Sequence, residues 1–481
     1  PHVQLYIDGH WREGAEARKL PVLNPATGEV MGDLACAETA DLEEVAEAAN
    51  RGFEVWRKIS AFDRYKMMRK AAQLLRDRVE TVAQLMTLEQ GKPLAEARME
   101  VMAGADTIDW FAEEGRRAYG RVIPARQMDV YQLVIKEPVG PVAAFTPWNF
   151  PINQIVRKLS AALAAGCSII VKAPEETPAS PAELIRAFID AGVPAGVVNL
   201  VYGDPAHIST YLIAHPAIRK ISFTGSTPVG KQLAAMAGQH MKRMTMELGG
   251  HAPVVVFNDA DIALAAKTMA ASKFRNAGQV CVSPTRFLVQ EGVYEEMVKL
   301  LAHQATNEIA VGMPNEDVIV GPVNNAAQFE RVKGFLDRVP SHARVVAGGS
   351  ALDRAGYFIA PTVIADLRQQ DEHIQSEIFG PVITIQKFKD EAEAIDIAND
   401  TEFGLGAGLW TKDMNLAYRM GRAIEAGRVW TNCYHHYPAH AAFGGYKKSG
   451  VGRETHKMML DHYQNTKNLL VSYTDSPLGF F

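Results

Sequence analysis

The sequence contains few cysteines and no long hydrophobic run. Among its 481 residues there are four cysteines, namely Cys36, Cys167, Cys281 and Cys433. They form neither a C-x-x-C pair nor a mixed cysteine and histidine spacing, so the sequence predicts no structural metal and favours a reducing cytoplasm. The most apolar stretch, residues 159–171, is interrupted by Gly166 and Ser168 and is too short to span a bilayer. The first residues lack the apolar core of a signal peptide.

The sequence also has no large excess of charge of one sign. Lysine and arginine total 50 against 55 aspartate and glutamate residues, which leaves a net charge of −5, and the basic residues are dispersed. This distribution argues against a nucleic-acid surface and against a polybasic membrane patch. With 47% hydrophobic residues, the chain is long enough for two or three domains with substantial cores.

Helical and strand-like patterns divide the chain. Residues 41–119 have helical spacing and predict three long helices, the first of which opens with a capping box from Asp41 to Glu44. From Val142 onwards short apolar segments alternate with helical ones, and strands are predicted at 142–145, 168–172, 197–201, 218–223 and 244–247. This alternation predicts a doubly wound parallel sheet.

A second α/β run follows. Its predicted strands are 254–257, 287–290, 383–388, 406–410 and 429–432. The division between the two runs falls near Gly249 and Gly250, so Glu247 and Cys281 are expected on either side of a cleft, where small-molecule sites commonly form.

Three polar residues near this division predict chemistry at a carbonyl carbon. Cys281 follows a turn rich in glycine and amides, and the N–H groups of that turn are expected to lower the pKa of its thiol. Glu247, among apolar neighbours at the end of a strand, would activate water as a general base with a raised pKa. Asn149 would donate its side-chain amide to the oxyanion. The alternatives are an inert thiol, a buried ion pair at Glu247 and a helix-capping turn at Asn149.

Two further segments are candidates for a nucleotide site. Residues 223–230 follow an apolar strand and open a helix, so their N–H groups can face a pyrophosphate, although the segment lacks both G-x-G-x-x-G and a P-loop ending. Lys172 and Glu175 follow another strand. The Glu175 carboxylate would accept hydrogen bonds from ribose hydroxyls and repel a 2′-phosphate, which favours NAD over NADP. The alternative is an ordinary surface ion pair.

Together these segments resemble the aldehyde dehydrogenase superfamily over essentially the whole chain. The resemblance is carried by residues 147–151, 171–175, 223–226, 246–250, 278–281, 377–381 and 443–450. It implies that Cys281 is the nucleophile, Glu247 the base and Asn149 the oxyanion donor, with Glu454 in a proton relay. It also implies a cofactor site formed by Trp148, Lys172, Glu175, Gly225, Ser226, Glu377 and Phe379.

The resemblance implies an α/β aldehyde dehydrogenase fold in three parts. These are a Rossmann-like NAD-binding domain at residues 1–124 and 138–248, a catalytic domain at residues 249–464, and a small β oligomerisation element at residues 125–137 and 465–481. Residues 132–135 are a plausible strand with an exposed edge, and a C-terminal strand at residues 468–473 would complete a neighbour's sheet. A homodimer or homotetramer is therefore expected.

Signals for the substrate point in two directions. Residues 1–290 look most like the dehydrogenases of succinate semialdehyde and 2-oxoglutarate semialdehyde. Arg157 and Arg275 match the arginines that clamp the distal carboxylate there, and a guanidinium fits a carboxylate in a bidentate way. The alternative is that acids of the protein satisfy both arginines.

The last fifty residues resemble instead the branch that oxidises acetaldehyde and other short aldehydes. The loop before Phe443 lacks the hydroxyl ligand expected for a carboxylate. It contains three histidines, His435, His436 and His440. No flanking acid or cysteine supports a metal there, so aromatic lining of a pocket is the favoured interpretation.

The predicted function is the NAD-dependent oxidation of an aldehyde to a carboxylic acid through a thiohemiacetal and a thioester on Cys281. A dicarboxylic semialdehyde is the favoured substrate, and a broad-range short-chain aldehyde is the alternative. A CoA-acylating relative is disfavoured because Glu247 is present, and that chemistry needs no base to activate water. A catalytically idle structural protein on the same fold is a remote alternative that an NADH-release assay would distinguish.

Overall fold

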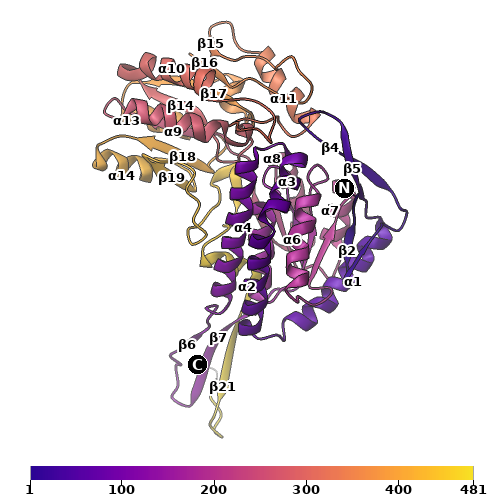
Figure 1. The fold of residues 1–481 in the computed structure, drawn as a ribbon. Helices are drawn as coiled ribbons and strands as arrows, with labels where there is room; N and C mark the ends of the chain where they lie inside the picture. Colours follow the sequence, from indigo (N-terminus) through magenta and orange to yellow (C-terminus); the bar gives the residue numbers. More distant parts are fainter. Residues whose placement is uncertain (1, 480–481) are drawn as a thin grey trace.

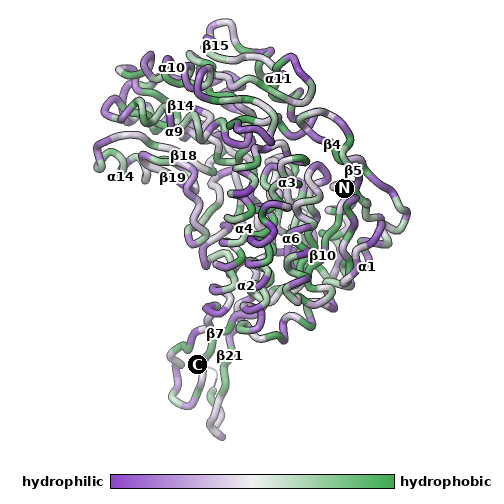
Figure 2. The backbone as a smooth tube through the Cα atoms, viewed as in Figure 1, coloured by the Kyte–Doolittle hydropathy of each residue, from purple (hydrophilic) through white to green (hydrophobic). Residues whose placement is uncertain are grey.

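The computed structural model describes residues 2–479 as two large helix-covered sheets, with a narrow third sheet that projects from them (Figure 1). This arrangement confirms the predicted α/β fold. Each large sheet has its own apolar core, with Leu159 and Phe188 in the first and Phe274 and Ile385 in the second. Figure 2 shows hydrophobic and hydrophilic residues alternating along helices such as α4 (Leu94–Gly115).

Four helices, and not the predicted three, follow the N-terminal strands. They are α1 (Thr39–Trp56), α2 (Ala61–Asp77), α3 (Val79–Gln90) and α4 (Leu94–Gly115). The extra break lies at Arg78, which leaves helical geometry between α2 and α3. The predicted capping box is also displaced. Glu38 is the N-cap of α1, and Asp41 Oδ2 accepts a hydrogen bond from the Glu38 N–H at 2.8 Å. The same buried oxygen also accepts from the Ala15 N–H at 2.9 Å.

The first large sheet has the strand order β20-β12-β11-β8-β9-β10-β2-β3. Its parallel strands are close to the predicted segments: β8 (Val142–Phe145), β9 (Ile169–Lys172), β10 (Val198–Val201), β11 (Lys220–Thr224) and β12 (Arg243–Glu247). Strands β8 to β11 are buried along their whole length, as is typical of parallel strands covered on both faces. The strand order changes direction between β8 and β11, and ligands bind at such a switch point.

Antiparallel edge strands and four helices complete this half. The edge strands are β2 (Leu5–Ile7), β3 (His10–Arg12) and β20 (Gly450–Val451). The helices are α5 (Asn153–Ala165), α6 (Ala179–Asp190), α7 (Pro205–Ala214) and α8 (Thr227–Gln239). A separate small sheet near the N-terminus contains β1 (His2–Val3), β4 (Lys19–Leu23) and β5 (Val30–Ala35).

The second large sheet has the order β15-β16-β17-β14-β13-β18-β19. Five strands correspond to predicted ones: β13 (Ala252–Val256), β14 (Pro284–Gln290), β17 (Val382–Phe388), β18 (Gly406–Trp410) and β19 (Arg428–Thr431). Strands β15 (Arg344–Ala347) and β16 (Thr362–Ala365) were not predicted. Strand β15 is an antiparallel edge strand with two exposed residues, so it lacks the wholly apolar run by which other strands were identified, while β16 is as buried as the predicted strands and was overlooked. The helices are α9 (Ile262–Phe274), α10 (Tyr294–His303), α11 (Ala326–Asp337), α12 (Glu372–Gln375), α13 (Glu391–Asn399) and α14 (Met414–Ala423).

The projecting sheet corrects one prediction. It contains β6 (Arg121–Ile123), β7 (Val130–Pro138) and β21 (Gln464–Ser472), with β7 in the middle. Residues 132–135 therefore have no exposed edge of their own, since Gln132 pairs with Leu470 on one side and Ile123 on the other. The C-terminal strand completes a sheet of its own chain, and the outer edges of this sheet belong to β6 and β21.

The predicted domain boundaries remain a prediction. Residues 1, 480 and 481, which end two of the predicted segments, lie outside the described residues. One strand crosses the proposed division, because β20 comes from residues 249–464 yet pairs with β12 of the first sheet. Within residues 2–479, none of the helices is both long and apolar enough to cross a membrane.

Candidate active site

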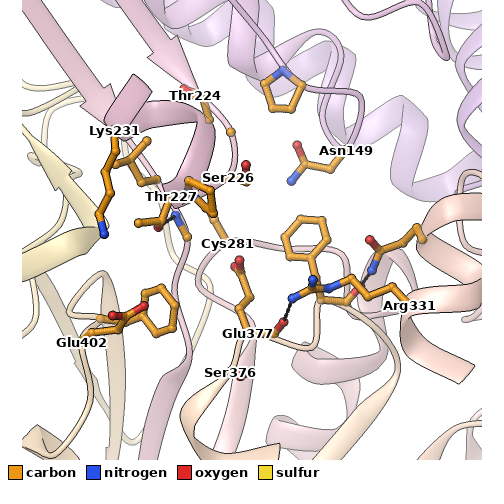
Figure 3. A pocket seen from close by; sticks show the side chains of 18 of the residues that line it. Asn149, Thr224, Ser226, Thr227, Lys231, Cys281, Arg331, Ser376, Glu377 and Glu402 are labelled. Carbon is orange, nitrogen blue, oxygen red and sulfur yellow. Dashed lines mark hydrogen bonds between the residues drawn. The ribbon is translucent and has the colours of Figure 1, made fainter. Parts of the chain in front are cut away.

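Cys281 lies where two cavities meet. A cavity of about 540 Å³ opens at the ends of β8 and β11, and a second of about 280 Å³ lies beside α4 and α5. Cys281 and Gln154 line both. Figure 3 shows Cys281 in the middle of the larger cavity, with Asn149, Ser226 and Glu377 around it. A group bound in either cavity can therefore reach the same sulfur atom.

A strained turn holds Cys281 in place. Asn276, Ala277 and Gly278 have left-handed backbone angles, with φ of 49°, 53° and 75°. A Cβ atom on Gly278 would lie 2.0 Å from the Gly380 carbonyl oxygen, so only glycine fits there. The Asn276 amide Nδ2 secures the turn, because it donates to the carbonyl oxygen of Asn149 at 3.0 Å. Strain of this kind persists only where the surroundings impose it.

The prediction for the pKa of Cys281 was wrong in direction. Burial raises the pKa of the Cys281 thiol, and the neighbouring Glu247 carboxylate raises it further, while Arg157 acts in the opposite sense. The amide-rich turn does not reverse this effect, because its groups hydrogen-bond mainly to one another and to Asn149. The thiol therefore needs a base or an additional positive charge in order to ionise.

Asn149 follows β8 and its side chain lies in the cavity wall near Cys281 (Figure 3). Its Nδ2 donates to the carbonyl oxygen of Gln279 at 3.2 Å, and one of the two N–H bonds of the amide remains for another acceptor. It does not cap the next helix, since Ile152 is the N-cap of α5. Asn149 is thus an amide donor in the wall of the cavity that Cys281 also lines.

Glu247 is the last residue of β12 and is buried. Its carboxylate accepts hydrogen bonds from Arg157 Nη1 at 3.4 Å and from Thr224 Oγ1 at 3.3 Å. Burial raises the pKa of Glu247 well above its ordinary value, and the negative charge of Glu454 raises it further. The raised pKa makes this carboxylate a stronger proton acceptor than an exposed glutamate.

The neighbours of Glu247 come from far along the chain. Strand β20 pairs with β12, and this pairing brings Glu454 close to Glu247. Lys158 donates to Glu454 and, at 2.6 Å, to Thr224 Oγ1. Burial by itself raises the pKa of the Glu454 carboxyl. The Lys158 ammonium outweighs this effect and holds the pKa of Glu454 below its ordinary value. Lys158 was not predicted as a site residue, although a lone lysine in an apolar helix was an available signal.

Five of the predicted cofactor residues line the larger cavity: Trp148, Gly225, Ser226, Glu377 and Phe379. Ser226 is the N-cap of α8 and its side chain makes no capping hydrogen bond, so the N–H groups of Thr227 and Val229 are available to an anion, while Pro228 between them has none. This geometry and the size of the cavity fit a dinucleotide. Lys231 and Arg331 also line this cavity and were not predicted as site residues (Figure 3).

Lys172 and Glu175 do not line that cavity. Their side chains form an ion pair at 2.6 Å, and Glu175 Oε1 also accepts a hydrogen bond from the Gly203 N–H at 3.0 Å. At the cavity itself, burial raises the pKa of Glu377 to about 7, and Glu377 Oε1 accepts from the Gly250 N–H at 3.0 Å.

Arg157 and Arg275 both line the smaller cavity, together with three aromatic rings, those of Phe150, Tyr437 and Phe443. The Arg157 guanidinium lies 4.8 Å from the centre of the Phe443 ring, and that of Arg275 lies 5.3 Å from the Phe150 ring. Arg157 also approaches Glu454 Oε2 at 3.6 Å. Among residues 2–479, no group of three or more His, Cys, Asp or Glu side chains is placed to hold a metal ion.

Comparisons with known proteins agree with this geometry. Residues 11–469 match the model of the aldehyde dehydrogenase family. The chain is 44% identical to the 4-(hydroxymethyl)benzenesulfonate dehydrogenase TsaD1 of Comamonas testosteroni, over 96% of this chain and 97% of that protein. It is 41% identical to the succinate-semialdehyde dehydrogenase [NADP(+)] GabD of Escherichia coli (strain K12), over 97% of each. The crystal structure of succinate-semialdehyde dehydrogenase from Burkholderia pseudomallei superposes with a TM-score of 0.96 at 39% identity, covering 98% of both chains.

Proposed function

The chain belongs to the aldehyde dehydrogenase family, and we propose that it oxidises an aldehyde with a distal anionic group, of the succinate or 2-oxoglutarate semialdehyde type, to the carboxylic acid. The observation that carries this proposal is Arg275. Its guanidinium lines the cavity beside Cys281, and no ion pair or hydrogen bond joins it to another of residues 2–479. A guanidinium in a pocket favours an anionic ligand.

The residues around Cys281 support a covalent mechanism. The Cys281 thiolate would attack the carbonyl carbon, and the remaining N–H bond of the Asn149 amide would stabilise the oxyanion of the thiohemiacetal. The dinucleotide, when bound, supplies the hydride acceptor that turns the thiohemiacetal into a thioester. Glu247 would then take a proton from the water that hydrolyses the thioester, and Glu454 with Lys158 would relay that proton.

NAD is the cofactor that we propose, held by the five predicted residues of the larger cavity. Glu175 lies outside the larger cavity, beside Lys172, and an adenosine ribose that extended to it would meet a carboxylate that repels the 2′-phosphate of NADP, which supports NAD. The E. coli relative is named for NADP(+), so the preference of this chain requires its own measurement.

A short uncharged aldehyde is the second candidate. The three aromatic rings of the smaller cavity favour it, since they offer an apolar wall. The test is kcat/KM for succinate semialdehyde and butanal with the parent and with Arg275→Ala. We expect the parent to favour the semialdehyde by about tenfold or more and Arg275→Ala to lose that preference. A parent that favours butanal would overturn the anionic substrate.

We also propose a homodimer or homotetramer in the cytoplasm. Apolar side chains on β21 support association, since Leu470 and Val471 are more than half exposed, at 56% and 52%. Sedimentation of the full chain would measure the oligomeric state.

A further inference from the structure

A buried ion pair lies behind the segment that carries Asn149. Lys92 is in the turn between α3 and α4, Glu100 is on α4, and Lys92 Nζ lies 2.6 Å from Glu100 Oε2, with both side chains buried. The ammonium also donates to the carbonyl oxygen of Asn149 at 2.9 Å and lies 4.0 Å from the centre of the Phe150 ring. It therefore has three partners, and two of them belong to the segment that follows β8.

The Glu100 carboxylate holds the other end of the same segment. Its Oε1 accepts hydrogen bonds from the N–H groups of Ile152 and Asn153, at 2.9 and 3.1 Å. Ile152 is the N-cap of α5 and its side chain has no acceptor, so this helix receives its cap from α4. Residues 149–153 are thereby fixed at both ends by one ion pair.

Helix α4 also holds the turn that precedes the thiol. Glu96 lies one turn before Glu100, on the same face of the helix, and its carboxylate accepts from the Asn276 N–H at 3.1 and 3.2 Å. The side-chain amide of Asn276 donates to the carbonyl oxygen of Asn149 at 3.0 Å. That oxygen has two donors as a result, Lys92 from the first half of the chain and Asn276 from the second.

The position of the Asn149 amide depends on these backbone contacts. Its Oδ1 has no hydrogen-bond partner among residues 2–479, and its Nδ2 donates to the carbonyl oxygen of Gln279 at 3.2 Å. The side chain thus has one hydrogen bond, at the long end of the normal range, whereas the backbone carbonyl has two. Where the amide lies is therefore decided mainly through the backbone.

The charge of Lys92 depends on Glu100. Burial lowers the pKa of Lys92, and the Glu100 carboxylate acts in the opposite sense. Glu96 also favours the charged form of Lys92, while Arg275 opposes it. Removal of either partner would leave the other as a buried charge without its counterion. Neither residue can hold the segment alone.

We propose that Lys92 and Glu100 are positioning residues that set the place of the Asn149 amide relative to Cys281. With Glu96 they form a set that we call the α4 charge cluster. This inference rests on the proposed function, in which the Asn149 amide stabilises the oxyanion. A donor of this kind is effective only where its direction is fixed before the charge develops, and the cluster fixes it.

The test is a double-mutant cycle on the first turnover of NADH, followed by stopped flow at saturating NAD with succinate semialdehyde and with butanal. Lys92→Met should slow this turnover by about tenfold or more in the parent and by less than about twofold in the Asn149→Ala background. Glu100→Gln keeps the shape of the side chain and should behave in the same way. Both aldehydes should show the same pattern, because the amide acts on the reacting carbonyl.

Glu89→Gln is the matched control. Glu89 is a buried carboxylate that accepts from the N–H groups of Ala179 and Ser180, at 2.7 and 2.8 Å, so it caps α6 as Glu100 caps α5. Its replacement should lower Tm, as Glu100→Gln does. The first turnover should nevertheless stay within about twofold of the parent, because α6 does not carry Asn149.

The role of the cluster is overturned if the effects of Lys92→Met and Asn149→Ala multiply, or if Asn149→Ala is as fast as the parent. Should Lys92→Met not fold, the cycle with Glu100→Gln decides, and a Glu100→Gln variant with an unchanged first turnover overturns the role. A parent that oxidises butanal but not succinate semialdehyde overturns the anionic substrate alone, and the cycle with butanal then tests the cluster. A parent that releases NADH from neither aldehyde overturns both.

Discussion

The two cavities that meet at Cys281 are built in different ways. The larger one is formed by the ends of β8, β11 and β12, by the first turn of α8 and by side chains of the second half such as Arg331, Glu377 and Phe379. The smaller one is formed by side chains from α4, α5, the turn before Cys281 and the loop before Phe443. Backbone groups at strand ends depend little on individual side chains, whereas a cavity built from side chains changes its ligand with one substitution. We therefore expect substitutions in the smaller cavity to change substrate preference more than cofactor binding.

The largest expected effect comes from the residue that both cavities share. Cys281→Ala should lower aldehyde oxidation by at least about a thousandfold, because the sulfur is the point of covalent attachment. NAD affinity, measured by calorimetry, should stay near the parent value, since the thiol contributes little to cofactor contacts. Turnover within tenfold of the parent would contradict the assignment of the nucleophile.

Replacement of Glu247 should distinguish the acylation of Cys281 from the hydrolysis of the thioester. Glu247→Gln should slow the hydrolysis of the thioester by about a hundredfold and acylation by much less. A rapid first turnover of NADH should then precede a slow steady state in stopped-flow measurements. An equal slowing of the first turnover would assign Glu247 an earlier role, such as ionising the Cys281 thiol.

Replacement of Arg157 tests whether its positive charge lowers the pKa of Glu247. The positive charge of Arg157 lowers the pKa of Glu247, against the raising effects of burial and of Glu454. Arg157→Gln removes this charge, so the pKa of Glu247 rises further and the acidic limb of the kcat profile moves to higher pH. We expect kcat at pH 7 to fall roughly threefold to tenfold and to recover as the pH rises. An unshifted profile would show that Arg157 does not act through the base.

The smallest effect concerns the cofactor. We expect the parent to prefer NAD over NADP by about tenfold in kcat/KM, which corresponds to about 1.4 kcal/mol, and Glu175→Gln to reduce that preference. Glu175 already binds Lys172 and the Gly203 N–H, so its carboxylate is fixed in direction. Equal or better use of NADP by the parent would mean that Glu175 points away from the ribose.

Much of the fold is predictable because the signals are local. Wholly apolar strands that alternate with helices predicted the parallel sheet, and the carboxyl ends of such strands meet at one edge. Asn149 and Glu247 lie at this edge for that reason, whereas Cys281 reaches it from the turn between α9 and β14 of the second sheet. The break at Arg78 and the pairing of residues 132–135 were missed, because packing and a strand more than three hundred positions later decide them.

The sequence by itself determined the family, the fold class and which side chains are available for the chemistry, since motifs and periodicity are short-range properties of the chain. Only the tertiary structure decided how those side chains are charged and paired. Arg157 lies 90 positions before Glu247, and Lys158 lies 296 positions before Glu454, yet these pairs set the state of the base. Burial, which no local pattern encodes, raises the pKa of the Cys281 thiol and leaves the Tyr437 hydroxyl without a partner. Desolvation and distant charges act through space, so they exist only once the chain has folded.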